Sequence, residues 1–261
     1  MAMSDRLLAP DEPPAVYERR RDGRSAFVIT VDHASPRIPR KLDELGLLAT
    51  DLERHIAWDI GAAAVAGELS AALDAALVAQ NYSRLVIDCN RSPGWPTSIP
   101  TVAESTAIPG NAGLLEAERT ARRMELFEPY HEHLRALLDE RQLAGRRTIL
   151  VAQHSMTQVF KGVRREMHAA VLYNRDRRFA GLVLDALRRE PELVIGDNEP
   201  YFCSAETDYT IPQHAEGRGL PYVELEIRQD LILDPPGQGA WARRIADALR
   251  HAEIAFWRDY P

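Results

Sequence analysis

Short apolar runs alternate along this chain with longer segments in which apolar residues recur at helical spacing. Runs that are apolar throughout are typical of strands buried on both faces of a sheet. They predict strands at 25–31, 84–88, 148–152, 169–173, 192–196 and 222–227. Helical spacing predicts helices over 51–75, 114–143, 176–190 and 237–257.

The order of these elements indicates the fold class. Strands that alternate with helices form a mixed, largely parallel sheet with helices on both faces, so we predict a three-layer α/β/α fold. A single domain is expected over 25–261. Residues 1–24 are polar and contain prolines, and we expect them to form a surface tail. The Pro- and Gly-rich segment 91–113 is typical of a long loop that walls a site.

Composition narrows the functional classes. The formal net charge is −7, whereas nucleic-acid-binding domains carry a basic excess, so nucleic acid is not an expected partner. No apolar run reaches membrane-spanning length and no signal segment is present at the N-terminus, which favours a cytoplasmic protein with no membrane contact. Cys89 and Cys203 are too few for a disulfide framework, and we expect both in the core.

Polar side chains follow several of the predicted strands. The carboxyl ends of parallel strands meet at one edge of a sheet, and ligands bind there in open α/β folds. We therefore expect these side chains to converge on a site. They are Asp32-His33, Asn90-Arg91, His154-Ser155, Asn174-Arg175 and Asp197.

Two histidines in this set indicate a metal centre. Two histidines on separate strand ends, joined by one carboxylate, are the smallest ligand set that a catalytic zinc site uses. His33 and His154 are the candidates. The pattern leaves the third ligand open between Asp59 and His55, which share one face of the predicted helix start. Asp59 lies among apolar residues, where an unpaired charge is costly.

A pair of glutamates and an arginine add to this picture. Period-two alternation in "VELEIR" puts Glu224 and Glu226 on one face of a strand, where two carboxylates repel unless one meets a cation. A solvated strand face is the alternative. Arg91 directly follows a predicted strand, a position that suits bidentate binding of a carboxylate, although a surface ion pair is the more common fate of arginine.

Taken together, these motifs resemble the N-formylglutamate amidohydrolase family. The resemblance covers residues 25–233 and rests on "VDHASPRIP", "HIAWDIGA", "YSRLVIDCNR", "QHSM", "GDNEPY" and "GLPYVELEIRQDL", in that order. That family is similar in fold to the zinc carboxypeptidases and the aspartoacylase-type deacylases. The resemblance therefore implies a phosphorylase/hydrolase-like, zinc-carboxypeptidase-like version of the three-layer fold.

The resemblance also implies an activity, namely metal-dependent hydrolysis of an N-acyl amino acid such as N-formylglutamate. His33 and His154 would bind one divalent metal, with zinc the expected ion, and Glu226 would be the general base. Pro36 stands where zinc carboxypeptidases have a glutamate ligand, so Asp59 is expected to be the third ligand.

Contacts with a small-molecule substrate are implied for a further set of arginines and polar residues. These are Asn90 and Arg91 for the α-carboxylate, Arg84 or Arg165 for the oxyanion, Arg175 or Arg164 for a charged substrate side chain, and Tyr209 with His214 for closure over the substrate.

Two other functions remain open from the sequence. One is a non-catalytic binding protein for small carboxylate metabolites on the same scaffold, and the other is a related deacylase or carboxypeptidase with a different substrate. The stretches 155–158, "SMTQ", and 165–168, "REMH", differ from the sequences common in the family, so the substrate is left open. A serine hydrolase is not expected, because Ser155 lacks the Gly-x-Ser-x-Gly elbow.

Overall fold

A mixed sheet organises the molecule. The computed structural model describes residues 6–260, so residues 1–5 of the expected tail lie outside the described residues. Within that range the central sheet has seven strands in the order β1-β3-β2-β6-β11-β9-β10. The strands are β1 (Val16–Arg19), β2 (Phe27–Val31), β3 (Ala76–Gln80), β6 (Ile149–Met156), β9 (Ala169–Leu172), β10 (Ile195–Asp197) and β11 (Tyr222–Arg228).

The direction of the strands defines two opposite edges. The central strands β3, β2, β6 and β11 run parallel, and β1 joins one side antiparallel. On the other side β9 is antiparallel to β11, and β10 is parallel to β9. The carboxyl ends of β2, β6 and β11 therefore meet at one edge, whereas those of β9 and β10 lie at the opposite edge.

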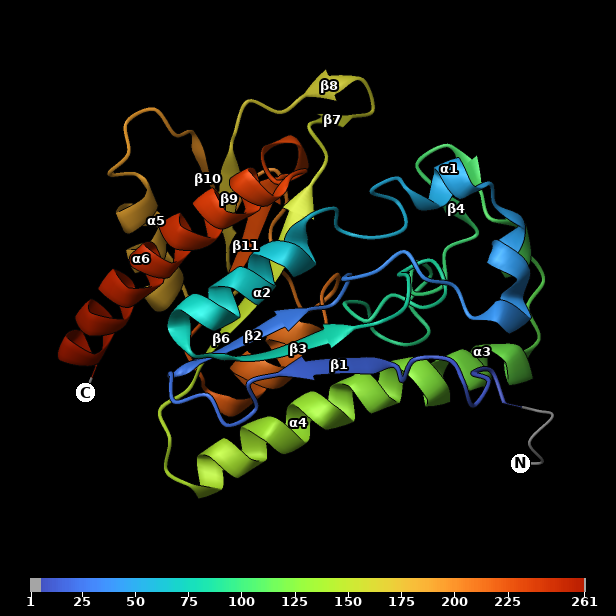
Figure 1. Cartoon of the computed structure of the whole chain (residues 1–261), viewed down its shortest axis with the longest axis horizontal. Helices are drawn as coiled ribbons and strands as arrows, with labels where there is room; N and C mark the ends of the chain where they lie inside the picture. The colour runs from blue at the N-terminus through green and yellow to red at the C-terminus, as the bar shows by residue number, and fades with distance from the viewer. Residues whose placement is uncertain (1–5, 261) are drawn as a thin grey trace.

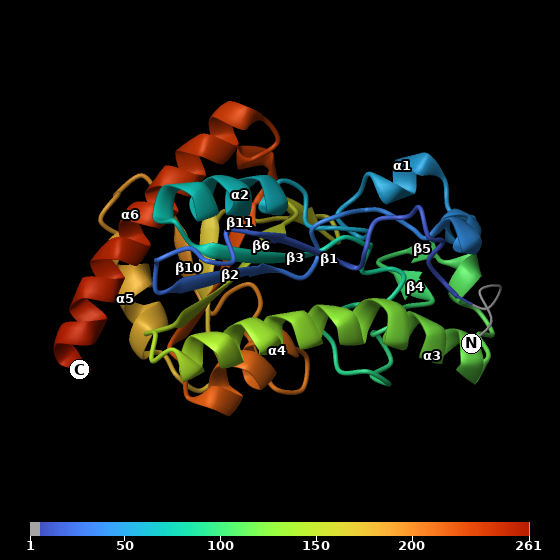
Figure 2. The same ribbon diagram turned by 60° about the horizontal axis from the view of Figure 1, so that its bottom comes forward.

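Helices cover both faces of this sheet, which confirms the three-layer α/β/α prediction. In Figure 2 the sheet lies between α2 and α6 on one side and α4 on the other. Helix α5 packs with α6 and α2 in the same core. The helices are α1 (Ala49–Leu52), α2 (Ala62–Leu73), α3 (Glu116–Arg122), α4 (Glu128–Leu143), α5 (Arg178–Leu187) and α6 (Pro235–Asp259).

Two small hairpins stand outside the main sheet. One joins β4 (Val102–Ala103) to β5 (Thr106–Ala107), and the other joins β7 (Val159–Phe160) to β8 (Val163–Arg164). Both rise beyond the carboxyl edge of the central strands (Figure 1).

The predicted strand over 84–88 is wrong. These residues form turns and irregular structure, and the strand on this side of β2 is instead β3, which directly follows the predicted helix 51–75. Leu85, Val86 and Ile87 are buried, but they pack in the apolar layer on the α4 side of the sheet. A short buried apolar run has the same pattern in either role, so periodicity alone cannot separate them.

The predicted helix 51–75 is also shorter than expected. Residues 53–61 form turns, and the continuous helix α2 begins only at Ala62. Gly61 precedes it in the left-handed conformation, with φ of +81°. His55 and Asp59 therefore do not share a helix face.

Strand β1 changes the picture of the N-terminal segment. The tail expected over 1–24 contains this edge strand, which pairs with β3 from Val16 to Arg19. Its residues are half-buried or exposed rather than fully buried, as the edge position requires, so the strand has no apolar run to reveal it.

Helix α6 shows how local sequence sets an element boundary. The carboxylate of Asp234 accepts the backbone N–H of Gly237 at 2.8 Å, which caps the first turn. Pro235 and Pro236 follow at the first helical positions, where a missing N–H costs nothing. None of the helices in residues 6–260 combines the length and apolar character that a membrane span requires.

Gly61 provides a test of the packing around α2. A Cβ at this position would lie 2.4 Å from the carbonyl oxygen of Ile232, and φ is positive. We expect Gly61→Ala to lower the free energy of unfolding by about 1–2 kcal/mol through backbone strain, with about 1–3 kcal/mol more from overpacking.

The matched control is Gly113→Ala, because Gly113 has φ of +65° with no atom within 4 Å of its Cβ position. It should show the strain alone. Urea unfolding of both variants measures the difference, and equal losses would contradict the packing described for Gly61.

Candidate active site

A cavity of about 580 Å³ lies over the carboxyl end of β6 and β11. Val223, Leu225 and Ile227 of β11 pack in the core beneath α2, α5 and α6. Because side chains alternate along a strand, Glu224 and Glu226 point to the other side, where they line the cavity. Many of the predicted site residues share this cavity. They are His33, Asp59, Arg84, Asn90, Arg91, His154 and Glu226.

His33, Asp59 and His154 come together at the base of this cavity. One ligand atom from each residue lies within 4.8 Å of the others, and all three side chains are buried. The Nδ1 atoms of His154 and His33 lie 2.8 Å and 3.3 Å from the same oxygen, Oδ2 of Asp59. Two imidazole nitrogens and one carboxylate oxygen thus face a common point.

The remaining nitrogen of each histidine faces a second carboxylate. Nε2 of His33 lies 2.7 Å from Asp88, and Nε2 of His154 lies 3.5 Å from Asp32. Metal-binding histidines are held in this way by carboxylates, which set the tautomer and the ring orientation. The donor set and its outer carboxylates therefore fit a divalent metal.

The charges in this group depend on one another. Burial opposes ionisation of His154, but Asp32 and Asp59 outweigh it and raise the pKa of His154 well above its usual value. Burial likewise opposes ionisation of the carboxyls, yet His33 and His154 hold the pKa of Asp59 below its usual range. His154 and His33, with the Tyr130 hydroxyl, lower the pKa of Asp32 to about 2.

Strand β6 runs further than predicted and places His154 within it. The expected strand ended at 152, but the observed strand continues to Met156. His154 stands directly opposite Glu226 of β11 in the parallel register. The register of two neighbouring strands thus puts a candidate metal ligand next to the candidate base.

Glu224 and Glu226 are both buried carboxyls. Glu226 is 8% exposed and Glu224 is 5% exposed. Burial raises the pKa of Glu226 to about 7 and that of Glu224 to about 8. His154, Arg165 and Arg84 partly offset this effect at Glu226.

Arg84 links Asp59, a candidate metal ligand, to Asp88. Its NH2 group donates to Asp88 at 2.8 Å, and NH1 approaches Asp59 at 3.5 Å. These carboxylates raise the pKa of Arg84 despite its burial, so the guanidinium is charged. Arg84 thus contributes a fixed positive charge to the cavity.

Asn90 and Arg91 hold the loop that carries Asp208. The Asn90 side chain donates to Asp208 at 3.0 Å and accepts the backbone N–H groups of Tyr209 and Thr210. Arg91 donates to the same Asp208 oxygen at 3.2 Å and to the carbonyl of Thr207. The amide of Asn90 is therefore engaged within the protein, whereas Arg91 keeps partial exposure at the cavity.

Other predicted site residues lie away from the cavity lining. Arg165 stacks between Phe160 and Tyr201, which themselves line the cavity. Arg175 pairs with Glu216 at the opposite edge of the sheet, because β9 runs antiparallel to β11. Arg164 is exposed on β8.

Tyr209 and His214 are not among the residues that line the cavity. Tyr209 packs against His131 and Phe127. His214 stacks on His131 with 2.9 Å between their ring nitrogens, and Nε2 of His131 lies 2.9 Å from the carbonyl of Cys89. Burial lowers the pKa of His131 to about 4, so this stack is uncharged at neutral pH.

The residue pattern placed Asp32 at the expected site without a role, and it did not single out Asp88 or Asp208. Asp32 and Asp88 each end an apolar run, a signal that was available in the sequence. Asp208 carried no such signal, because its contact with Arg91 joins positions 117 residues apart.

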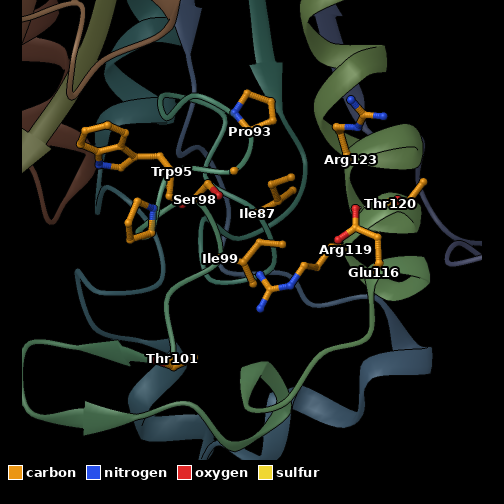
Figure 3. Close-up of a pocket in the computed structure, with 12 residues that line it drawn as sticks. Ile87, Pro93, Trp95, Ser98, Ile99, Thr101, Glu116, Arg119, Thr120 and Arg123 are labelled. Carbon is orange, nitrogen blue, oxygen red and sulfur yellow. Dashed lines mark hydrogen bonds between the residues drawn. The ribbon is translucent and has the colours of Figure 1, made fainter.

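The loop over 91–113 forms a wall between two cavities. Thr97 and Pro100 line the cavity described above, whereas Ser98 and Ile99 line a second cavity of about 430 Å³. Figure 3 shows this second cavity between the loop and the α3 segment, which contributes Arg119 among others. No histidine is among its lining residues, so the group that could hold a metal belongs to the first cavity.

Two solved structures resemble this protein. The structure superposes on that of a gene product from Agrobacterium tumefaciens with a TM-score of 0.93 and 38% identity, covering 96% of this chain and 99% of that chain. It also resembles N-formylglutamate amidohydrolase from Ralstonia eutropha JMP134, with a TM-score of 0.65 and 19% identity over 93% of this chain and 98% of that chain. At 19% identity, the similarity to the Ralstonia eutropha structure shows that the two proteins share a fold. No curated protein matches this chain.

The sequence itself decides the family. The sequence model of the N-formylglutamate amidohydrolase family matches residues 25–233, the range over which the motifs follow the family order. This chain belongs to the N-formylglutamate amidohydrolase family.

Proposed function

We propose that this protein is a metal-dependent hydrolase that cleaves the amide bond of an N-acyl amino acid, with an N-formyl amino acid as the expected substrate. Membership of an amidohydrolase family supports amide hydrolysis. The observation that carries the proposal is the buried group of His33, Asp59 and His154 directly beside the buried carboxyl of Glu226.

His33, Asp59 and His154 would hold one divalent ion, with zinc the expected metal. When bound, the ion supplies Lewis acidity that activates water at neutral pH and polarises an acyl carbonyl. Asp88 and Asp32 would keep both imidazoles oriented toward it.

Glu226 is the proposed general base. It accepts a proton from the attacking water and passes it to the leaving amine, a role that requires a carboxyl whose pKa lies near the working pH. Burial raises the pKa of Glu226 to about 7, which meets this requirement.

Two arginines have proposed roles toward the substrate. Arg84 stands among the residues around the metal ligands, where its charge would stabilise the developing oxyanion. Arg91 also lines the cavity and would bind the α-carboxylate. Asn90 positions the loop beside it, and Arg165 adds positive charge near Glu226.

Metal content provides the first test. We expect the purified protein to contain about one divalent ion per chain, measured by mass spectrometry of the metals. Asp59→Asn should lose most of this metal, because an amide is a much weaker ligand than a carboxylate.

His55→Ala is the control for this experiment, since His55 lines the cavity beside Glu104 but stands outside the ligand group. It should keep the metal. A metal-free wild-type protein that binds small carboxylates would instead favour the non-catalytic binding protein.

The role of Glu226 provides the second test. Glu226→Gln should lower kcat by about 100- to 10,000-fold while the metal content stays at the wild-type level. The exposed residue Glu132 offers a matched control, and Glu132→Gln should keep full activity. Turnover within tenfold of wild type in Glu226→Gln would assign the base elsewhere.

The pH profile provides a third test. Because Glu226 acts in its ionised form, kcat/KM should fall as the pH drops below about 7, the value to which burial raises its pKa. Residual activity of Glu226→Gln should lack this acidic limb. Profiles of the two proteins that share the same limb would show that another group controls it.

A further inference from the structure

Glu224 is a buried carboxyl that the proposed mechanism does not use. It lines the cavity two residues before Glu226 on the same face of β11, and it is only 5% exposed. Its Oε2 atom has no hydrogen-bond partner in residues 6–260. An unsatisfied buried polar group costs about 1–3 kcal/mol, so a missing partner at this position calls for an explanation.

Glu226, the proposed base, shares this feature, because its Oε2 atom also has no hydrogen-bond partner in residues 6–260. The remaining acids that line the cavity have positive partners. Asp59 and Asp88 face Arg84, and Asp208 faces Arg91. Both arginines of the cavity lining are therefore already paired with carboxylates.

Glu104 is paired as well, with Arg54 at 3.1 Å. No arginine or lysine pairs with Glu224 in the part of the chain that the structure describes. The acids Asp208 and Glu226 act against its ionisation, and His154 favours it. Glu224 is thus a buried carboxyl of the cavity without a matching arginine or lysine.

The position of Glu224 relative to the reacting groups indicates what faces it. The Cα of an N-acyl amino acid is bonded both to the scissile nitrogen, which must lie near Glu226, and to the α-carboxylate, which Arg91 would bind. The substrate side chain therefore starts between these two points. Glu224 lies two residues along the strand from Glu226, about 7 Å away on the same face, within reach of a long side chain.

We propose that this cavity selects N-acyl amino acids whose side chain ends in a cation, an ammonium or a guanidinium, and that Glu224 is the residue that determines this specificity. The inference rests on the proposed function and names its substrate class. A positive group next to Glu224 supplies the missing partner and favours the ionised carboxylate. The second carboxylate of a glutamate side chain would instead meet Glu224 and Asp208.

The hydrolysis itself is unchanged. Water adds across the C–N bond, so the acyl carbon gains the hydroxyl oxygen and the nitrogen gains a proton. The products are the free carboxylic acid and the basic amino acid with a free α-amine.

A substrate panel tests the inference on the metal-loaded protein. The panel contains the Nα-formyl derivatives of lysine, arginine, norleucine, glutamine and glutamate. Norleucine is the neutral counterpart of lysine, so their ratio isolates the charge. We expect kcat/KM for the lysine and arginine compounds to exceed that for norleucine by about tenfold or more, as a charge-assisted hydrogen bond provides, and the glutamate compound to be the poorest.

Substitution of the carboxyl assigns the preference to Glu224. Glu224→Gln should bring the lysine-to-norleucine ratio close to one. Glu104→Gln is the matched control, because this cavity carboxylate already has a cationic partner, and it should preserve the wild-type ratio. A preserved ratio in Glu224→Gln would overturn the assignment.

Binding of the free amino acids separates the two proposals. Calorimetry on the wild-type protein should show lysine binding more tightly than norleucine, whether or not any formyl compound is hydrolysed. Turnover with glutamate preferred over lysine would overturn the specificity and leave the hydrolase intact. Tighter binding of lysine without turnover of any compound would overturn the hydrolase and leave the specificity intact.

Discussion

Buried carboxylates at the carboxyl edge of a parallel sheet must be balanced by positive groups, and the rest of the site depends on this constraint. Asp32, His154, Asp59, His33 and Asp88 form one unbroken series of contacts, which Arg84 closes. An isolated charge in such a place would cost several kcal/mol. The series is stable because every acid in it touches a cation or an imidazole, so the loss of one member leaves its neighbours unpaired.

The sequence predicts which residues belong to this series better than it predicts the contacts between them. His33 and His154 follow from their places at the ends of apolar runs. Asp59 followed from its apolar surroundings and from the family resemblance, although the helix on which it was expected begins only after it. Arg175 could not be placed correctly, because nothing in an apolar run tells whether its strand lies parallel or antiparallel to its neighbour.

Contacts between distant segments account for most of what the pattern missed. Asn90 was expected to bind substrate, but its amide meets the backbone of a loop about 120 residues further along. Arg122 also has partners in a distant segment. Its buried guanidinium donates to Asn111 and to the carbonyls of Val86 and Gly110. These bonds join helix α3 to the loop that precedes it. Such partners are set by packing, which a local pattern does not contain.

The pairing of Glu226 with His154 has a consequence for folding. A slip of one residue between β6 and β11 would turn Glu226 into the apolar layer beneath α6 and bring Leu225 to the cavity. A chain with this misalignment would therefore bury a charge in the apolar core and also lose the geometry of the cavity. The geometry of the His33, Asp59 and His154 group and the position of Glu226 therefore depend on the same strand alignment, and both are formed only when the central strands pair in the correct register.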